Sequence, residues 1–168
     1  HKQNILHLDL KPENIMLEES GLVKIVDFGL ARAMDQKELA RLSGRAGTFG
    51  YMAPEQWEGG TVGKTTDVFS LGVVLYEMLS GQLPFRGESE PAVVYSILHE
   101  HPEPLTALRA GLPLELERVI GKMLAKDPGG RYQHVEDLMV DLRTLRGRPQ
   151  GGHRQLATQP WTARFLPE

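Results

Sequence analysis

Hydrophobic and polar residues follow different patterns in successive parts of the chain. Residues 15–17 and 23–26 are two short β-prone runs, and Ser20 and Gly21 between them suit a turn, so we predict a β-hairpin. From residue 30 to residue 66 no period is sustained, and glycine, serine, arginine and proline are scattered through the segment. Such a long stretch is expected to carry little regular structure and to be functional or disordered.

The most apolar segment lies at residues 67–80 and predicts a helix. Thr66 or Asp67 suits its N-cap, Gly81 suits the position after its last residue, and proline at 84 prevents continuation. Apolar residues cover nearly its whole circumference, which predicts burial on all sides, with Leu71 and Leu75 enclosed. At about 14 residues the helix is too short to span a bilayer.

Three further helices are expected, over residues 91–100, 113–126 and 135–145. The last of them is expected to turn Leu138, Met139 and Leu142 inward. After residue 146 the periodicity is lost, so we divide the chain into a domain over residues 1–146 and a linker or tail over 147–168. The predicted fold is mainly α with a small β-hairpin, built around one buried helix.

The composition narrows the functional classes. The chain has 168 residues, 40% of them hydrophobic, and 19 Lys+Arg against 22 Asp+Glu give a net charge of -3. This balance provides no basic patch for a nucleic acid or an anionic membrane, and no apolar run is long enough for a membrane segment. The chain contains no cysteine, which excludes thiolate metal sites and cysteine nucleophiles and fits a reducing compartment. We therefore expect a cytoplasmic protein.

A compact set of polar residues lies near the start, within the sequence HLDLKPENIML at residues 7–17. Asp9 can orient an attacking hydroxyl and take its proton, and Lys11 provides a point charge for a phosphate. Asn14 and Asp27 offer the oxygen ligands that suit Mg²⁺, and the predicted hairpin between them would bring both to one edge. Together these groups provide the positioning and charge neutralisation that phosphoryl transfer requires.

Each of these residues also has a simpler interpretation. Asp9 and Lys11 could form a solvated surface pair, and Asp27 could be an ordinary turn residue. Thr48 could be a loop threonine without a special role. The joint occurrence of these residues in order favours a functional site.

Three motifs in order resemble those of the protein kinase family. The segments DLKPEN, DFG and APE, at residues 9–14, 27–29 and 53–55, resemble its catalytic loop, metal-binding turn and activation-segment end. The later DVFSLG and KDPGGRY resemble its central helix and closing arginine motif, so the resemblance covers about residues 5–145. It implies a C-terminal kinase lobe. The family's glycine-rich loop, strand lysine and glutamate partner are not in this sequence, so we expect the N-terminal lobe to be a missing partner.

The resemblance implies a role for each site residue. Asp9, Lys11 and Thr48 would be catalytic. Lys11, Asn14 and Asp27 would bind ATP, with Asn14 and Asp27 as the Mg²⁺ ligands. Lys11 resembles the Ser/Thr subclass, and the segments GTFGYMAPEQ and KDPGGRY resemble the eukaryotic-like Ser/Thr kinases of bacteria.

Other positions resemble structural features of the family. Glu55 and Arg131 are expected to form a buried ion pair, Asp67 to accept hydrogen bonds from the catalytic-loop backbone, and His7 to be structural rather than a base. The family usually has an arginine before the catalytic aspartate, and it binds a phosphate on the activation loop. Leu8 stands there in this chain, which predicts that loop phosphorylation is not an obligatory switch.

The leading functional hypothesis is a protein serine/threonine kinase. As a complete catalytic domain it would transfer the γ-phosphate of ATP, with Mg²⁺, to hydroxyl groups of a protein substrate, whereas residues 1–168 alone would be inactive. The alternative is a non-catalytic pseudokinase or isolated lobe whose groove near residues 48–55 binds a peptide. Retention of Asp9, Lys11, Asn14 and Asp27 favours the enzyme, because a scaffold has no physical need for all four.

Overall fold

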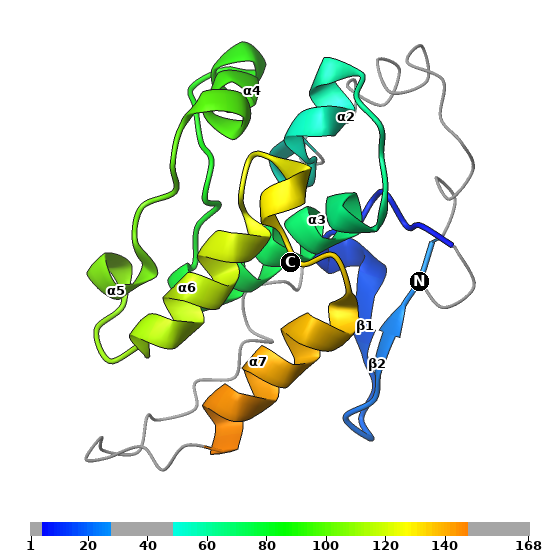
Figure 1. Ribbon diagram of the computed structural model, residues 1–168, viewed down its shortest axis with the longest axis vertical. Helices are drawn as coiled ribbons and strands as arrows, with labels where there is room; N and C mark the ends of the chain where they lie inside the picture. The colour runs from blue at the N-terminus through cyan, green and yellow to red at the C-terminus, as the bar shows by residue number, and fades with distance from the viewer. Residues whose placement is uncertain (1–4, 28–48, 148–168) are drawn as a thin grey trace, which may run out of the picture.

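The computed structural model describes residues 5–27 and 49–147, which form a helical body with a two-stranded sheet on one side (Figure 1). The fold class predicted from the sequence, mainly α with one small hairpin, is confirmed. No helix within these residues is long and apolar enough to cross a membrane. In chain order the elements are η1 (Pro12–Asn14), β1 (Ile15–Leu17), β2 (Val23–Ile25), η3 (Phe49–Tyr51), α2 (Pro54–Glu58), α3 (Lys64–Ser80), α4 (Glu90–His99), α5 (Leu105–Leu108), α6 (Leu114–Met123), η4 (Pro128–Gly130) and α7 (Val135–Gly147).

The hairpin of β1 and β2 has the predicted position and turn. The strands are antiparallel, with Met16 opposite Lys24 at the centre of the register. Gly21 has a φ of 81°, a conformation that glycine adopts without steric cost, so the tight turn depends on it. The hairpin places the residues before β1 beside those after β2.

Helix α3 lies at the centre of the molecule (Figure 1), with Phe69 and Val73 fully buried. It begins at Lys64 rather than at the predicted cap, because Thr66 already lies inside its first turn and accepts a hydrogen bond from the Gly63 N–H. It ends as predicted, with Gly81 in the left-handed conformation at a φ of 77°.

The prediction that α3 is enclosed on all sides is wrong. Met78 is 60% exposed, and Leu71 and Leu75 are only partly buried. Residues 71, 75 and 78 share one helix face, and the surrounding helices cover this face incompletely. The two leucines pack against a core cluster that includes Met123 of α6 and Leu138 of α7, whereas Met78 lies at the surface.

Helices α3 and α6 approach each other closely at Gly72. A Cβ atom at this position would lie 2.8 Å from the Cβ of Met123, so only glycine fits without a shift of the helices. On α6, Val119, Ile120 and Met123 are buried. This contact joins the two main clusters of the core.

The remaining helices differ from the predictions in detail. α4 begins one residue earlier, α6 ends three residues earlier, and α7 extends two residues further than expected. Met139 does not turn inward; it is 42% exposed, whereas its neighbour Leu138 is 1% exposed. The short helices α2 and α5 were not predicted, because five or four residues are too few to show a helical period.

Candidate active site

The segment before η1 is held by α3. The backbone N–H groups of His7 and Leu8 donate to the two carboxylate oxygens of Asp67, at 2.9 and 2.8 Å. Asp67 is 4% exposed, and burial raises the pKa of its carboxyl above the ordinary value, while the two N–H donors oppose that rise. The predicted bonds between Asp67 and this backbone are therefore confirmed.

Leu8 has a strained backbone that needs this support. Its φ of 63° is uncommon for a residue with a side chain and destabilising unless the surroundings enforce it. Its N–H is bonded to Asp67, and its carbonyl oxygen accepts a hydrogen bond of 3.1 Å from Nε2 of Gln56 on α2. Two buried side chains from different helices thus fix the residue that precedes Asp9.

His7 connects the same segment to the end of β2. Nδ1 of its ring accepts a hydrogen bond from the Asp9 N–H at 3.3 Å, so in the neutral ring Nε2 carries the proton. Nε2 then donates to the carbonyl oxygen of Val26 at 3.0 Å. Because both ring nitrogens are bonded to backbone, this geometry supports the prediction that His7 is structural.

Asp9, Lys11 and Asn14 converge. Nζ of Lys11 lies 3.1 Å from Oδ2 of Asp9, with the two side chains 17% and 13% exposed, so they do not form a solvated surface pair. Nδ2 of Asn14 donates to the carbonyl oxygen of Asp9 at 2.8 Å and to its Oδ2 at 3.2 Å. The carboxylate of Asp9 is thus oriented by an ammonium and a carboxamide.

The hairpin brings Asp27 towards Asn14. The Val26 N–H donates to the carbonyl oxygen of Asn14 at 2.9 Å, which places Asp27 one residue beyond a direct backbone contact. Asp27 is exposed and has a φ of 60°, so it is the second residue of this region with a left-handed backbone. Strained residues of this kind cluster at functional sites.

The donor atoms fit a magnesium ion held together with a nucleotide. With Nδ2 of Asn14 bonded to Asp9, its Oδ1 has no hydrogen-bond donor among the described residues, and Asp27 adds a carboxylate. Within residues 5–27 and 49–147 no three His, Cys, Asp or Glu side chains are grouped to hold a metal alone. Mg²⁺ usually takes one or two carboxylates plus phosphates and water, so a small protein ligand set suits it.

Glu55 and Arg131 form the predicted buried ion pair. The guanidinium donates to both carboxylate oxygens, each at 2.8 Å, and the arginine side chain is 0% exposed. Its remaining N–H groups donate to the carbonyl oxygens of Thr65, Ala125 and Lys126, so all five donors are used. Burial alone would raise the pKa of the Glu55 carboxyl, but the Arg131 guanidinium lowers it below the ordinary value.

Two predicted features lie outside the described residues, namely Thr48 and the tail after residue 147. Conversely, sequence reasoning assigned no role to Gln56, whose Oε1 accepts the Ala53 N–H at 2.9 Å while its Nε2 bonds Leu8. It also missed the 2.6 Å hydrogen bond from the Tyr51 hydroxyl to Glu77. The Gln56–Leu8 and Tyr51–Glu77 bonds join residues 48 and 26 positions apart, and no local pattern predicts such contacts.

Comparison with known proteins agrees with this geometry. The family model of the protein kinase domain matches residues 1–141, so the chain belongs to the protein kinase family. Within that family it belongs to the bacterial-type serine/threonine kinases, as the following relatives show.

The relatives are named serine/threonine kinases of bacteria. The chain is 41% identical over 152 residues to PknB of Mycobacterium tuberculosis, covering 89% of this chain and 24% of that protein. It is 38% identical over 149 residues to a probable serine/threonine-protein kinase of Clostridium perfringens, covering 89% of this chain and 22% of that protein. It is 42% identical over 144 residues to PknB of Mycolicibacterium smegmatis, covering 84% of this chain and 23% of that protein. The chain thus spans less than a quarter of the length of these curated relatives.

Proposed function

We propose that this chain is the C-terminal lobe of a protein serine/threonine kinase that phosphorylates protein hydroxyl groups with ATP. The observation that carries the proposal is the arrangement of the Asp9 carboxylate between Nζ of Lys11 and Nδ2 of Asn14. A general base must be oriented and within reach of its proton, and phosphoryl transfer is catalysed mainly by positioning and by charge.

Each residue contributes a defined function. Asp9 orients the attacking hydroxyl of the substrate and accepts its proton. Lys11 stabilises the negative charge of the phosphate that is transferred, and its Nζ orients the Asp9 carboxylate at 3.1 Å. Oδ1 of Asn14 and the carboxylate of Asp27 would hold Mg²⁺, which would neutralise phosphate charge.

The surface of the hairpin supports the assignment as one lobe of a larger domain. Its exposed large apolar side chains, together with one on the segment before it, range from 45% to 58% exposed. Leu17, Val23 and Ile25 share one face of the two-stranded sheet. An exposed apolar face of this kind marks an interface with another part of the protein or with a ligand. We assign it to contact with the nucleotide-binding lobe. The residues concerned are Ile5, Met16, Leu17, Leu22, Val23 and Ile25.

Leu8 bears on the regulation of this kinase. Its side chain is apolar and 6% exposed, so it offers no cation to a phosphate on the activation segment. Its backbone, in contrast, is fixed by Asp67 and Gln56. In this proposal the catalytic loop is therefore ordered by buried hydrogen bonds, without a requirement for a phosphorylated residue.

The experiment uses the protein with its complete catalytic domain. We expect Asp9→Asn to lower the rate of phosphate transfer from ATP to casein by about 100- to 10,000-fold, because the variant cannot accept the hydroxyl proton. Asp137→Asn, at an exposed aspartate in the first turn of α7, is the matched control and should retain activity. Unchanged activity of Asp9→Asn would refute the catalytic role and favour the peptide-binding alternative.

A second measurement tests the lobe assignment. Residues 1–168 alone should bind ATP weakly and transfer no phosphate, because the covering loop and second lysine that hold phosphates in this family are not among them. Robust transfer by this chain would refute the assignment, even if Asp9 proved essential.

A further inference from the structure

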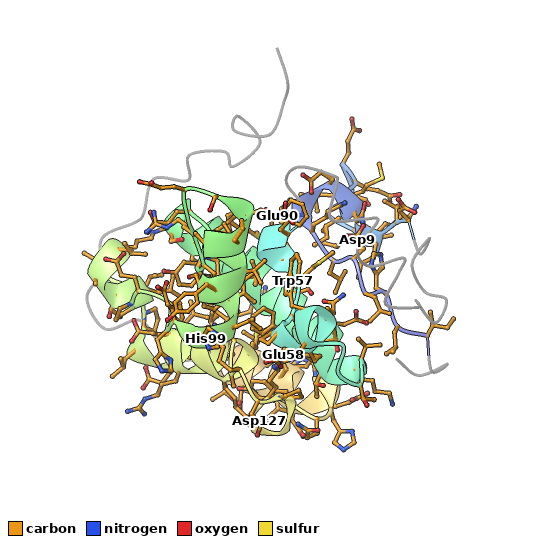
Figure 2. The ribbon with its side chains drawn as sticks, turned by 90° about the horizontal axis from the view of Figure 1, so that it is seen from above. Asp9, Trp57, Glu58, Glu90, His99 and Asp127 are labelled. Atoms are coloured by element: carbon orange, nitrogen blue, oxygen red, sulfur yellow. The ribbon has the colours of Figure 1, made fainter. Side chains whose placement is uncertain are left out.

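A pocket on the opposite side of the molecule from the candidate active site has the properties of a separate ligand site. Its volume is about 610 Å³, within the range of roughly 300–1,000 Å³ that is typical of small-molecule sites. Four segments contribute to its wall: Tyr76 of α3, residues 101–105, the outer face of α6, and residues 125–127. In Figure 2 Asp127, at the edge of this pocket, lies far from Asp9.

The wall of the pocket is mainly apolar, and α6 leaves space in it. Leu105, Ile120 and Leu124 line the pocket and belong to the core. Between the last two lies Gly121, where an added Cβ would have no atom of the described residues within 4 Å. Glycine inside a helix is less stable than alanine, and no close helix contact requires it at this position, unlike at Gly72. Gly121 is exposed, so the pocket is open to the solvent here and leaves room for a ligand.

The anionic groups at the pocket are already bonded within the protein. The carboxylates are those of Glu103, Glu117 and Asp127, and each has a protein donor or cation nearby. Their partners are Arg86 at 3.9 Å from Glu103, the N–H and hydroxyl of Thr106 at 2.8 Å from Glu117, and the Gly129 N–H at 3.1 Å from Asp127.

The cationic groups at the pocket have no carboxylate bonded to them among the described residues. Within the described part of the chain, Arg118 has no hydrogen bond or ion pair. Nζ of Lys126 has three donors, of which two contact the carbonyl oxygens of Ser96 and Ile97 at the end of α4, and it lies over the Phe85 ring. Burial lowers the pKa of this ammonium to about 8. The cation of Arg131 contributes to this lowering of the pKa, and the carboxylate of Glu100 opposes it.

The apolar wall is joined by the Arg118 guanidinium and by one donor of the Lys126 ammonium that the carbonyl oxygens of Ser96 and Ile97 do not use. This combination selects a particular ligand chemistry. We propose that the pocket binds a small molecule with an apolar body and a single carboxylate, the body lying against Gly121 and Ile120 and the carboxylate between Arg118 and Lys126. This site does not involve Asp9, so the proposal stands or falls independently of phosphate transfer.

The test measures binding of decanoate, below its micelle concentration, to the full chain by calorimetry, with two-dimensional NMR to locate it. We expect saturable binding of one molecule, with the largest shifts at the amides of Gly121 and Lys126. Gly121→Leu fills the space and should weaken binding by about tenfold or more. Decylamine, which has the same chain and the opposite charge, should bind more weakly than decanoate.

Matched variants separate shape from charge. Arg118→Gln should weaken decanoate binding by about threefold or more, and it keeps the test decisive if Gly121→Leu does not fold. Arg143→Leu and Arg143→Gln place the same residues at an exposed position of α7 and should change nothing. Three results would each overturn the proposal: no saturable binding, shifts confined to the hairpin, or equal binding of decylamine and decanoate.

Discussion

Replacing Arg131 by methionine tests whether the buried ion pair stabilises the fold. Methionine keeps an unbranched apolar side chain at this position but removes all five N–H donors and the cation that lies over the Phe69 ring. Glu55, at 5% exposure, then keeps only the Thr66 hydroxyl at 2.8 Å as a side-chain donor, and three carbonyl oxygens lose their guanidinium contact.

The expected loss follows from this uncompensated charge. Removing one partner of a buried pair typically lowers the free energy of unfolding by about 3–5 kcal/mol. Whole domains are stable by only about 5–15 kcal/mol, so the change should be a large part of the total. Urea denaturation followed by far-UV circular dichroism measures it directly.

Two further variants decide whether the reasoning is correct. Arg86→Met removes an arginine that is 55% exposed and 3.9 Å from its carboxylate, so its loss should be at most about 1 kcal/mol. The double variant Glu55→Met/Arg131→Met removes both charges and should be more stable than Arg131→Met alone. The reasoning is refuted if Arg131→Met lowers the free energy of unfolding no more than Arg86→Met does. It is also refuted if the double variant loses as much as Glu55→Met and Arg131→Met together, each measured as a single variant.

Three other predictions concern the same region. The pKa of the Glu55 carboxyl lies below its ordinary value in the folded state, so the stability that this group contributes is present at neutral pH and is lost as the pH falls through the folded-state pKa. Glu55→Gln should therefore flatten the acidic part of a profile of unfolding free energy against pH. An unchanged profile would contradict this assignment. Gln56→Leu leaves the N–H of Ala53 and the carbonyl oxygen of Leu8 without their buried partner, so it should lower the free energy of unfolding by about 1–3 kcal/mol. A loss below about 0.5 kcal/mol would show that these hydrogen bonds are unimportant for stability. Burial, reinforced by the hydrogen bond to Glu77, raises the pKa of the Tyr51 hydroxyl above its ordinary value of 10.0. An ultraviolet titration of Tyr51→Phe should therefore match that of the unaltered chain up to pH 10, because Tyr51 does not ionise in this range. A difference between the two titrations below pH 10 would refute the burial of this hydroxyl.

Features that depend on neighbouring residues could be predicted from the sequence. The hairpin follows from two β-prone runs with a glycine turn, and the end of α3 follows from Gly81, because turns and caps are set by local backbone preferences. The polar residues of the candidate active site could be recognised because Asp9, Lys11 and Asn14 lie within six positions of one another. The family itself could be recognised from the order of three short motifs.

The conformation of the site is determined by contacts that no local pattern contains. The left-handed backbone of Leu8 is maintained by Asp67 and Gln56, which follow it by 59 and 48 positions. The partial exposure of Leu71, similarly, depends on how far the neighbouring helices cover one face of α3, and an apolar sequence cannot specify that. The sequence by itself determined which chemical groups are available and which short segments turn or coil. Only the tertiary structure decided which groups meet, because buried hydrogen bonds and packing between distant segments overcome the strain and desolvation that each group would otherwise carry.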